Sequence, residues 1–141
     1  MPENEAFLSM GVDDLASALE ADITDDEGPL DLLAHSFGCI VALRMALRGR
    51  CEISRMLLLE PVALPVLKLV GKGDAFLQAK SIFDAYDEYH RAGEPYAVSR
   101  MINFWFGDGA FDVFPEPVRD YLDALTEINL RDIKATMAET Y

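Results

Sequence analysis

The residue types that could carry out chemistry gather in one short segment, Ala34-His35-Ser36-Phe37-Gly38. This segment follows a short apolar run at 29–33 and opens a nearly all-apolar stretch at 37–47. The order predicts a strand, a very tight turn with Ser36 at its tip, and then a buried helix. It is typical of a nucleophile elbow, usually written G-x-S-x-G, here with alanine in the first position. Ser36 is therefore the candidate nucleophile.

A serine hydroxyl is a weak nucleophile that must pass its proton to a positioned base, usually a histidine oriented by an acid. The strained turn is expected to lift Ser36 clear of the sheet. The N–H of Phe37, at the helix N-terminus, can donate to a developing oxyanion. We expect small residues at positions 34 and 38 because strand and helix should nearly touch there. The alternative is an ordinary helix start capped by serine, and the strand and helix context favours the elbow.

Two histidines and one carboxylate are the other candidates. His35 adjoins Ser36 but should point away from it, so we expect a packing or hydrogen-bonding role. His90 lies in an amphipathic helix beside Asp87, most simply on a solvated face. Glu60 ends an apolar strand at the edge where α/β folds bind ligands, so it is a weak candidate for the acid. The favoured alternative for Glu60 is a structural turn with its carboxylate bonded nearby.

Several aromatic side chains follow the strands and predict either a pocket or a core. The candidate substrate-binding residues are His35, Phe76, Phe83 and Trp105, and Phe104 and Phe111 belong to the same aromatic set. Aromatic residues at helical spacing are more often core, and we expect most of these to be core. The carboxylates are scattered, and no metal-ligand pattern is evident.

The elements that position the elbow form one strand-helix-strand unit. Apolar spacing predicts a helix over 12–23, a strand over 30–34, a helix over 37–48 that Gly49 ends, and a strand over 53–60. The continuous apolar run 56–59 is typical of a central parallel strand that is buried on both faces. The crossover between the two strands should be right-handed.

The character of the chain changes after Pro65, and no strand pattern follows residue 60. Amphipathic helices are predicted over 74–91 and 96–106, then a loop at 111–117 and further helices over 118–128 and 130–141. The only organisational border lies near 61–73. The sequence therefore predicts two regions, an elbow-bearing core over 1–64 and a helical region over 65–141.

Composition excludes several kinds of partner. The chain has 141 residues and a formal net charge of −13, so nucleic acid and membrane surfaces are poor partners. Its two cysteines are too few for a disulfide framework, and the acidic N-terminus does not resemble a signal peptide. These features favour a protein of the cytoplasm.

Taken together, the segment resembles the middle of an α/β-hydrolase-fold protein. Residues 30–60 are similar to the strand, elbow, helix and following strand at the centre of that fold. Residues 61–141 resemble the helical cap inserted after that strand, and 12–23 the helix before the nucleophile strand. The expected fold is thus α/β, a partial α/β-hydrolase fold in which a βαβ nucleophile-elbow unit precedes an all-helical cap. The resemblance implies acyl transfer from an ester-like substrate through Ser36, with no cofactor.

The sequence also departs from the family pattern. The family's early oxyanion loop, its usual catalytic acid after the cap and its catalytic histidine after the last strand are absent. By resemblance to members that place the acid at the end of the strand, Glu60 could orient a histidine. We therefore expect an interior segment of a larger hydrolase. The alternative is a catalytically inactive truncated hydrolase that binds an apolar ligand or a protein, with homo-oligomers formed through exposed sheet edges.

Overall fold

The computed structural model describes residues 11–23 and 28–140. The chain forms two compact units, which divide after Ala63. The predicted acidic N-terminus lies outside the described residues.

The first unit contains the predicted strand-helix-strand sequence. Its elements, in chain order, are α2 (Val12–Asp22), β1 (Leu30–His35), α3 (Phe37–Arg48) and β2 (Ile53–Leu59). Helix α3 ends where predicted, because Gly49 takes the left-handed conformation (φ 61°) in which glycine has no steric penalty. Strand β1 continues one residue further than the sequence predicted and runs directly into the elbow.

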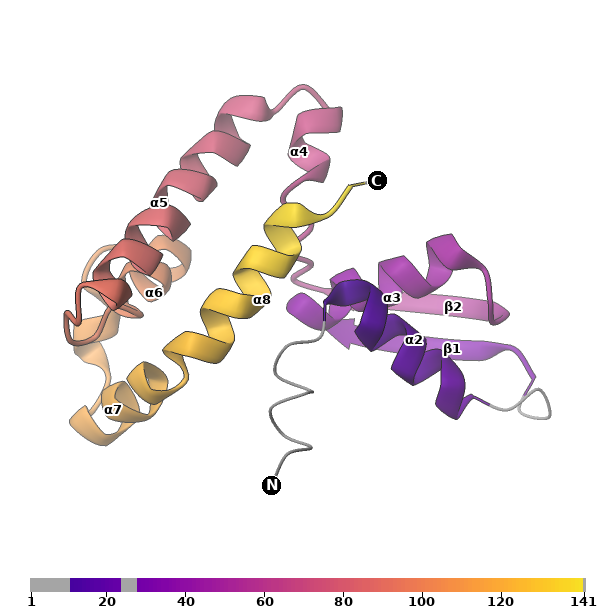
Figure 1. Cartoon of the computed structure of the whole chain (residues 1–141), viewed down its shortest axis with the longest axis horizontal. Coiled ribbons are helices and arrows are strands. Elements are labelled where there is room, and N and C mark those ends of the chain that lie inside the picture. Colours follow the sequence, from indigo (N-terminus) through magenta and orange to yellow (C-terminus); the bar gives the residue numbers. More distant parts are fainter. Residues whose placement is uncertain (1–10, 24–27, 141) are drawn as a thin grey trace. The chain divides into compact units, whose positions relative to one another are not determined.

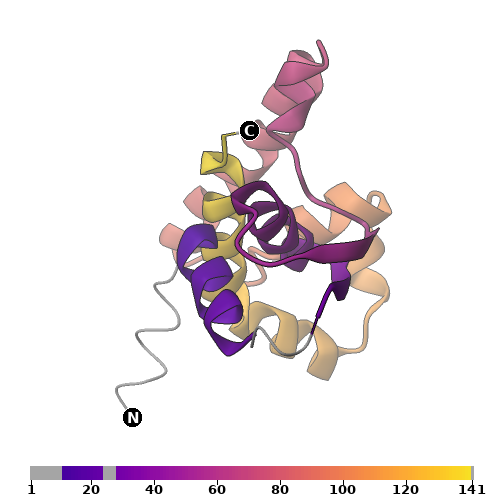
Figure 2. The same cartoon turned by 90° about the vertical axis from the view of Figure 1, so that its right-hand side faces the viewer.

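Strands β1 and β2 pair in parallel, with Leu33 opposite Leu57 and His35 opposite Leu59. Helix α3 lies against the two strands, as Figures 1 and 2 show, and its buried residues include Ile40 and Met45. Within the first unit, no described element covers the other side of the sheet. Leu33 is 70 % exposed and Leu57 is 58 % exposed.

The prediction that β2 is buried on both faces is therefore wrong for this structure. The burial of β1 alternates strictly along the strand, and that of the second half of β2 alternates in phase with it. Successive side chains point to opposite faces, so a single covering helix buries only every second residue. A continuous apolar run indicates that both faces of the strand are apolar, but it does not identify what covers the second face.

Helix α2 packs on α3 through small and charged side chains. Ala16 is fully buried, and Val12 is nearly so. The Arg48 guanidinium of α3 reaches back to α2, where it donates to the Asp13 carbonyl (2.9 Å) and to the Ser17 hydroxyl (2.7 Å). This guanidinium therefore ties the helix after the elbow to the helix before the nucleophile strand.

The second unit is entirely helical within the described residues. Its elements are α4 (Val66–Leu69), α5 (Gly73–Arg91), α6 (Ser99–Phe106), the 3-10 helix η2 (Ala110–Val113), α7 (Glu116–Ala124) and α8 (Thr126–Ala138). The core of this unit consists of side chains from α5, the turn before α6, α6 itself, η2 and α8: Tyr86, Ala97, Val98, Ile102, Phe111 and Leu130. No helix within 11–23 and 28–140 is both long and apolar enough to cross a bilayer.

Several helix limits differ from the predicted ones. The helix predicted over 118–128 is broken at Leu125, so Ile128 belongs to α8. The predicted loop at 111–117 contains η2 and the first turn of α7, where Pro117 suits a helix start because it needs no N–H acceptor. Apolar spacing continues across such breaks, so it did not reveal them.

Helices α5 and α8 lie side by side (Figure 1), and a charged bridge joins them. The Asp87 carboxylate of α5 accepts from Lys134 Nζ of α8 (2.8 Å) and from Arg91 Nη2 one turn further along α5 (2.7 Å). The hydrogen bond from Lys134 is the main reason that the pKa of Asp87 lies below its usual value. The bridge thus joins α5 and α8 at their partly exposed edge.

Candidate functional site

The elbow is built from the end of β1 and the start of α3. Ser36 is the single residue between them, with φ 51° and ψ −122°. A positive φ is uncommon for a residue with a side chain, and it persists only when the surrounding structure enforces it. Here the chain must turn sharply from an extended strand into a helix. The backbone at Ser36 therefore has the strained geometry of a nucleophile elbow.

Ser36 is not an ordinary helix cap. An N-cap residue usually has an extended backbone and accepts a hydrogen bond from the first turn through its side chain. Ser36 has neither feature, because its φ is positive and its side chain makes no capping hydrogen bond. The residues before it are extended, as the elbow interpretation requires. The geometry thus favours the elbow over the capping alternative.

The backbone next to Ser36 offers a hydrogen-bond donor. Phe37 is the first residue of α3, so its N–H has no acceptor within the helix. Two residues further along, the Cys39 N–H is used within the turn, where it donates to the Ser36 carbonyl (3.1 Å). The positive end of the helix favours an anion beside the Phe37 N–H.

The structure corrects our reason for the small residue at position 38. A Cβ atom added to Gly38 would meet no described atom within 4 Å, and Gly38 is exposed. The expected close contact between strand and helix is therefore absent at this position. Within the elbow Ser36 has a positive φ and Gly38 does not, so the turn is made without help from the following glycine.

His35 and Glu60 meet at the carboxyl edge of the sheet. His35 Nε2 lies 3.3 Å from Glu60 Oε2, and both side chains are largely exposed. Glu60 follows β2 directly and has a φ of 50°. His35 thus has a hydrogen-bonding role, as its position beside Ser36 suggested. Among the described residues, no three histidine, cysteine, aspartate or glutamate side chains gather to hold a metal ion.

The remaining candidates lie in the helical unit. Phe76 and Phe83 are buried, and Phe83 packs edge-to-face on Phe104 with ring centroids 5.7 Å apart. Trp105 is 43 % exposed and contacts the Phe104 ring in a tilted arrangement, with ring centroids 4.6 Å apart. His90 is exposed on α5. The buried phenylalanines belong to the packing of this unit, and their role in substrate binding stays a prediction.

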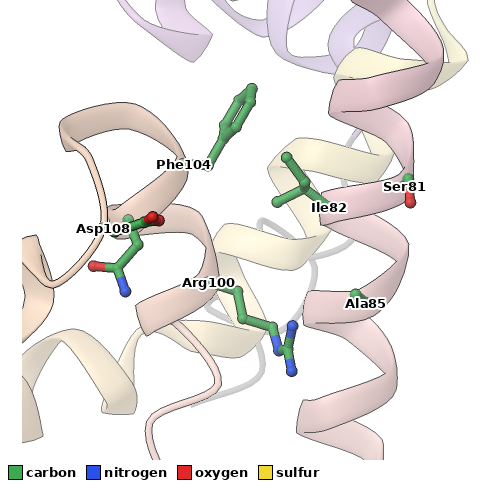
Figure 3. Close-up of a pocket in the computed structure, with 7 residues that line it drawn as sticks. Ser81, Ile82, Ala85, Arg100, Phe104 and Asp108 are labelled. Atoms are coloured by element: carbon green, nitrogen blue, oxygen red, sulfur yellow. The ribbon is translucent and has the colours of Figure 1, made fainter.

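A polar hollow on the helical unit was not predicted from the sequence. It has a volume of about 590 Å³ and lies between α5 and α6 (Figure 3). The lining residues are Ser81, Ile82, Ala85, Arg100, Asn103, Phe104 and Asp108. Arg100 lies over the Tyr89 ring (3.5 Å to its centroid), and its buried Nε has no hydrogen-bond partner in the part of the chain that the structure describes. Among these lining residues, only Phe104 belonged to the predicted aromatic set. The sequence did not single out the polar ones, because they resemble the residues of an ordinary helix surface.

The strain at Ser36 predicts an effect on stability. Replacing Ser36 by glycine should raise the free energy of unfolding by about 1 kcal/mol relative to Ser36→Ala. Glycine removes a backbone strain of about 1–3 kcal/mol but loses about 0.5–1 kcal/mol through the greater freedom of the unfolded chain. Urea denaturation of the two variants measures the difference. A glycine variant less stable than the alanine variant would show that the turn is unstrained.

A model of the alpha/beta hydrolase family matches residues 3–141, which is nearly the whole chain. The chain therefore belongs to the alpha/beta hydrolase family, and its fold is a partial α/β fold with a helical cap. No curated protein and no solved structure matches it.

Proposed function

We propose that the chain belongs to a serine hydrolase that cleaves an ester-like substrate by acyl transfer through Ser36. The observation that carries the proposal is the positive φ of Ser36 between a parallel strand and a helix start. An elbow of this kind holds a hydroxyl where a substrate carbonyl can approach it. Family membership alone does not identify a reaction, so the proposal rests on this site.

In the proposed reaction, Ser36 Oγ attacks the substrate carbonyl while its proton passes to a base. The Phe37 N–H donates to the oxyanion that forms on the carbonyl oxygen. The intermediate collapses, the alcohol leaves with a proton, and the acyl group stays on Ser36. Water then hydrolyses the acyl-enzyme by the same steps. No cofactor takes part in the proposed reaction.

The proposal assigns no base within this chain. His35 is engaged with Glu60, and His90 lies on an exposed face of α5 next to Asp87 and Arg91. A general base from outside the described residues would complete the reaction. Glu60 remains the weak candidate acid, and its observed partner is His35 rather than a separate catalytic histidine.

The proposed location is the cytoplasm. Cys39 and Cys51 are both free thiols in the structure, as is usual in a reducing compartment. The net charge of −13 supports a neutral small-molecule substrate over nucleic acid or an anionic membrane surface.

A fluorophosphonate probe tests the role of Ser36. We expect slow phosphonylation of the purified chain at Ser36 and no adduct on the matched variant Ser36→Ala, as read by intact mass and peptide mapping. The reaction should be slow because Ser36 lacks a base in this chain. An adduct that persists in Ser36→Ala would remove Ser36 from the proposal.

A second candidate function is favoured by the uncovered face of the sheet. Leu33 and Leu57 are opposite each other in the register, and both are exposed. Leu59, the next residue of β2 on the same face, is exposed as well. Exposed apolar side chains grouped in this way mark surfaces that bind a partner. The chain would then be a non-catalytic module that binds an apolar ligand or a protein, including a second copy of itself. A folded chain that gives no adduct at all would favour this second function.

A further inference from the structure

Three hydrogen bonds join the elbow to the end of β2, and all three meet at Leu59 and Glu60. The Ser36 N–H donates to the Leu59 carbonyl (3.0 Å), and the Cys39 thiol donates to the same carbonyl oxygen (3.3 Å). His35 Nε2 pairs with Glu60 Oε2 (3.3 Å). The residues on both sides of the elbow are therefore fixed to the neighbouring strand.

Such fixing is needed because each of the two neighbouring strands is followed directly by a residue with a strained backbone. Ser36 and Glu60 have φ angles of 51° and 50°, and neither is glycine. Each such residue has a sparsely populated backbone conformation and relaxes unless its surroundings hold it. Glu60 also precedes Pro61, which restricts its backbone further. The bonds to Leu59 and Glu60 oppose this relaxation at both positions.

We propose that Cys39, His35 and Glu60 are positioning residues that hold the Ser36 turn against the end of β2. We call the Cys39–Leu59 and His35–Glu60 bonds the elbow anchor. The inference rests on the proposed function of Ser36, because it gives these side chains their purpose. None of the three acts on the substrate in this proposal; each acts by fixing the backbone that presents the nucleophile.

The two parts of the elbow anchor differ in strength. Cys39 is fully buried, so water does not compete for its bond to the Leu59 carbonyl. The side chains of His35 and Glu60 are 65 % and 85 % exposed, and exposed pairs contribute little. Removing the Cys39 thiol should therefore loosen the elbow more than removing the His35 imidazole.

Amide hydrogen exchange at Ser36 reports whether the elbow anchor holds the turn, because this N–H donates to the same Leu59 carbonyl that the Cys39 thiol bonds. The measured quantity is the exchange rate of Ser36 divided by that of mid-helix amides of α3, such as Ala42 and Met45, in the full ¹⁵N-labelled chain. A general loss of stability speeds all of these amides together and leaves the ratio unchanged.

We expect Cys39→Ala to raise the ratio about threefold to tenfold and His35→Ala to raise it about twofold. The matched variants Cys39→Ser and His35→Gln keep a hydrogen-bond donor, and their ratios should stay within about twofold of the original. A merely structural role for Cys39 would not be rescued by serine, because serine adds a polar group to a buried apolar site.

Unchanged ratios in both Cys39→Ala and His35→Ala would overturn the elbow anchor. Fluorophosphonate labelling of the same samples keeps this outcome separate from the role of Ser36. Labelling at Ser36 with unchanged ratios would remove the positioning residues and leave the nucleophile. Raised ratios without labelling would support the elbow anchor and count against Ser36 as a reactive serine.

Discussion

Replacing Tyr86 by alanine should lower the free energy of unfolding of the helical unit by about 3–5 kcal/mol, as for other buried aromatic residues. Tyr86 on α5 is fully buried and lies at the centre of the core with Val98, Ile102 and Leu130. Removing its side chain leaves a cavity that the closely packed helices around it cannot close. Because Trp105 is the only tryptophan and lies in this unit, its fluorescence during urea denaturation reports the loss.

The matched control is Tyr86→Phe, which keeps the ring and removes only the hydroxyl. The buried Tyr86 hydroxyl makes no hydrogen bond of standard geometry among the described residues and interacts only weakly with the Thr126 hydroxyl, so its loss should change stability by less than about 1 kcal/mol. Burial raises the pKa of Tyr86 above its usual 10.0. The stability linked to this group is therefore present below pH 10 and is lost as the pH rises through the raised pKa, and Tyr86→Phe should lack this alkaline loss. Equal losses in the two variants would contradict a packing role for the ring.

Replacing Arg48 by methionine should cost about 2–3 kcal/mol, because it leaves a carboxylate enclosed between α2 and α3. Glu20 has a side chain that is only 7 % exposed, and its Oε2 lies 3.5 Å from Arg48 Nη1. Breaking a buried pair from one side usually costs about 3–5 kcal/mol. We expect less here because Arg50 also contacts Glu20 (3.4 Å). Far-ultraviolet circular dichroism during urea denaturation measures the loss.

Two further variants make the Arg48 result specific. Arg50 is 60 % exposed, so Arg50→Met should cost less than about 1 kcal/mol. Combining Arg48→Met with Glu20→Leu removes both charges and should recover much of the lost stability. If the double variant is no more stable than Arg48→Met, the hydrogen bonds from Arg48 to Asp13 and Ser17 carry the effect instead of the ion pair.

The elbow could be predicted from the sequence because its geometry is set over a few neighbouring residues. A strand pattern that meets a helix pattern within one residue leaves only a sharp turn between them, and the structure has that turn at Ser36. The same local logic placed the end of α3 at Gly49. The uncovered face of the sheet could not be predicted, because the apolar run at 56–59 records only that the residues are apolar.

The contacts of the elbow required the register of the two strands. His35 and Glu60 are 25 residues apart in the sequence, and they meet because β1 and β2 pair in parallel with His35 opposite Leu59. Cys39 is buried, and its thiol donates to the Leu59 carbonyl, 20 residues further along the chain. Neither contact leaves a signal in local spacing.

The amino-acid order alone therefore determined the family, the βαβ unit, the helical region after it and the serine at the turn. These features depend on steric preferences and apolar periodicity within short windows. Only the tertiary structure decided which partner His35 binds, that Gly38 needs no close packing, and that the leucines of one sheet face are exposed. Those outcomes depend on which distant segments pair and in what register, and a shift of one residue in that register would exchange the two faces of the sheet.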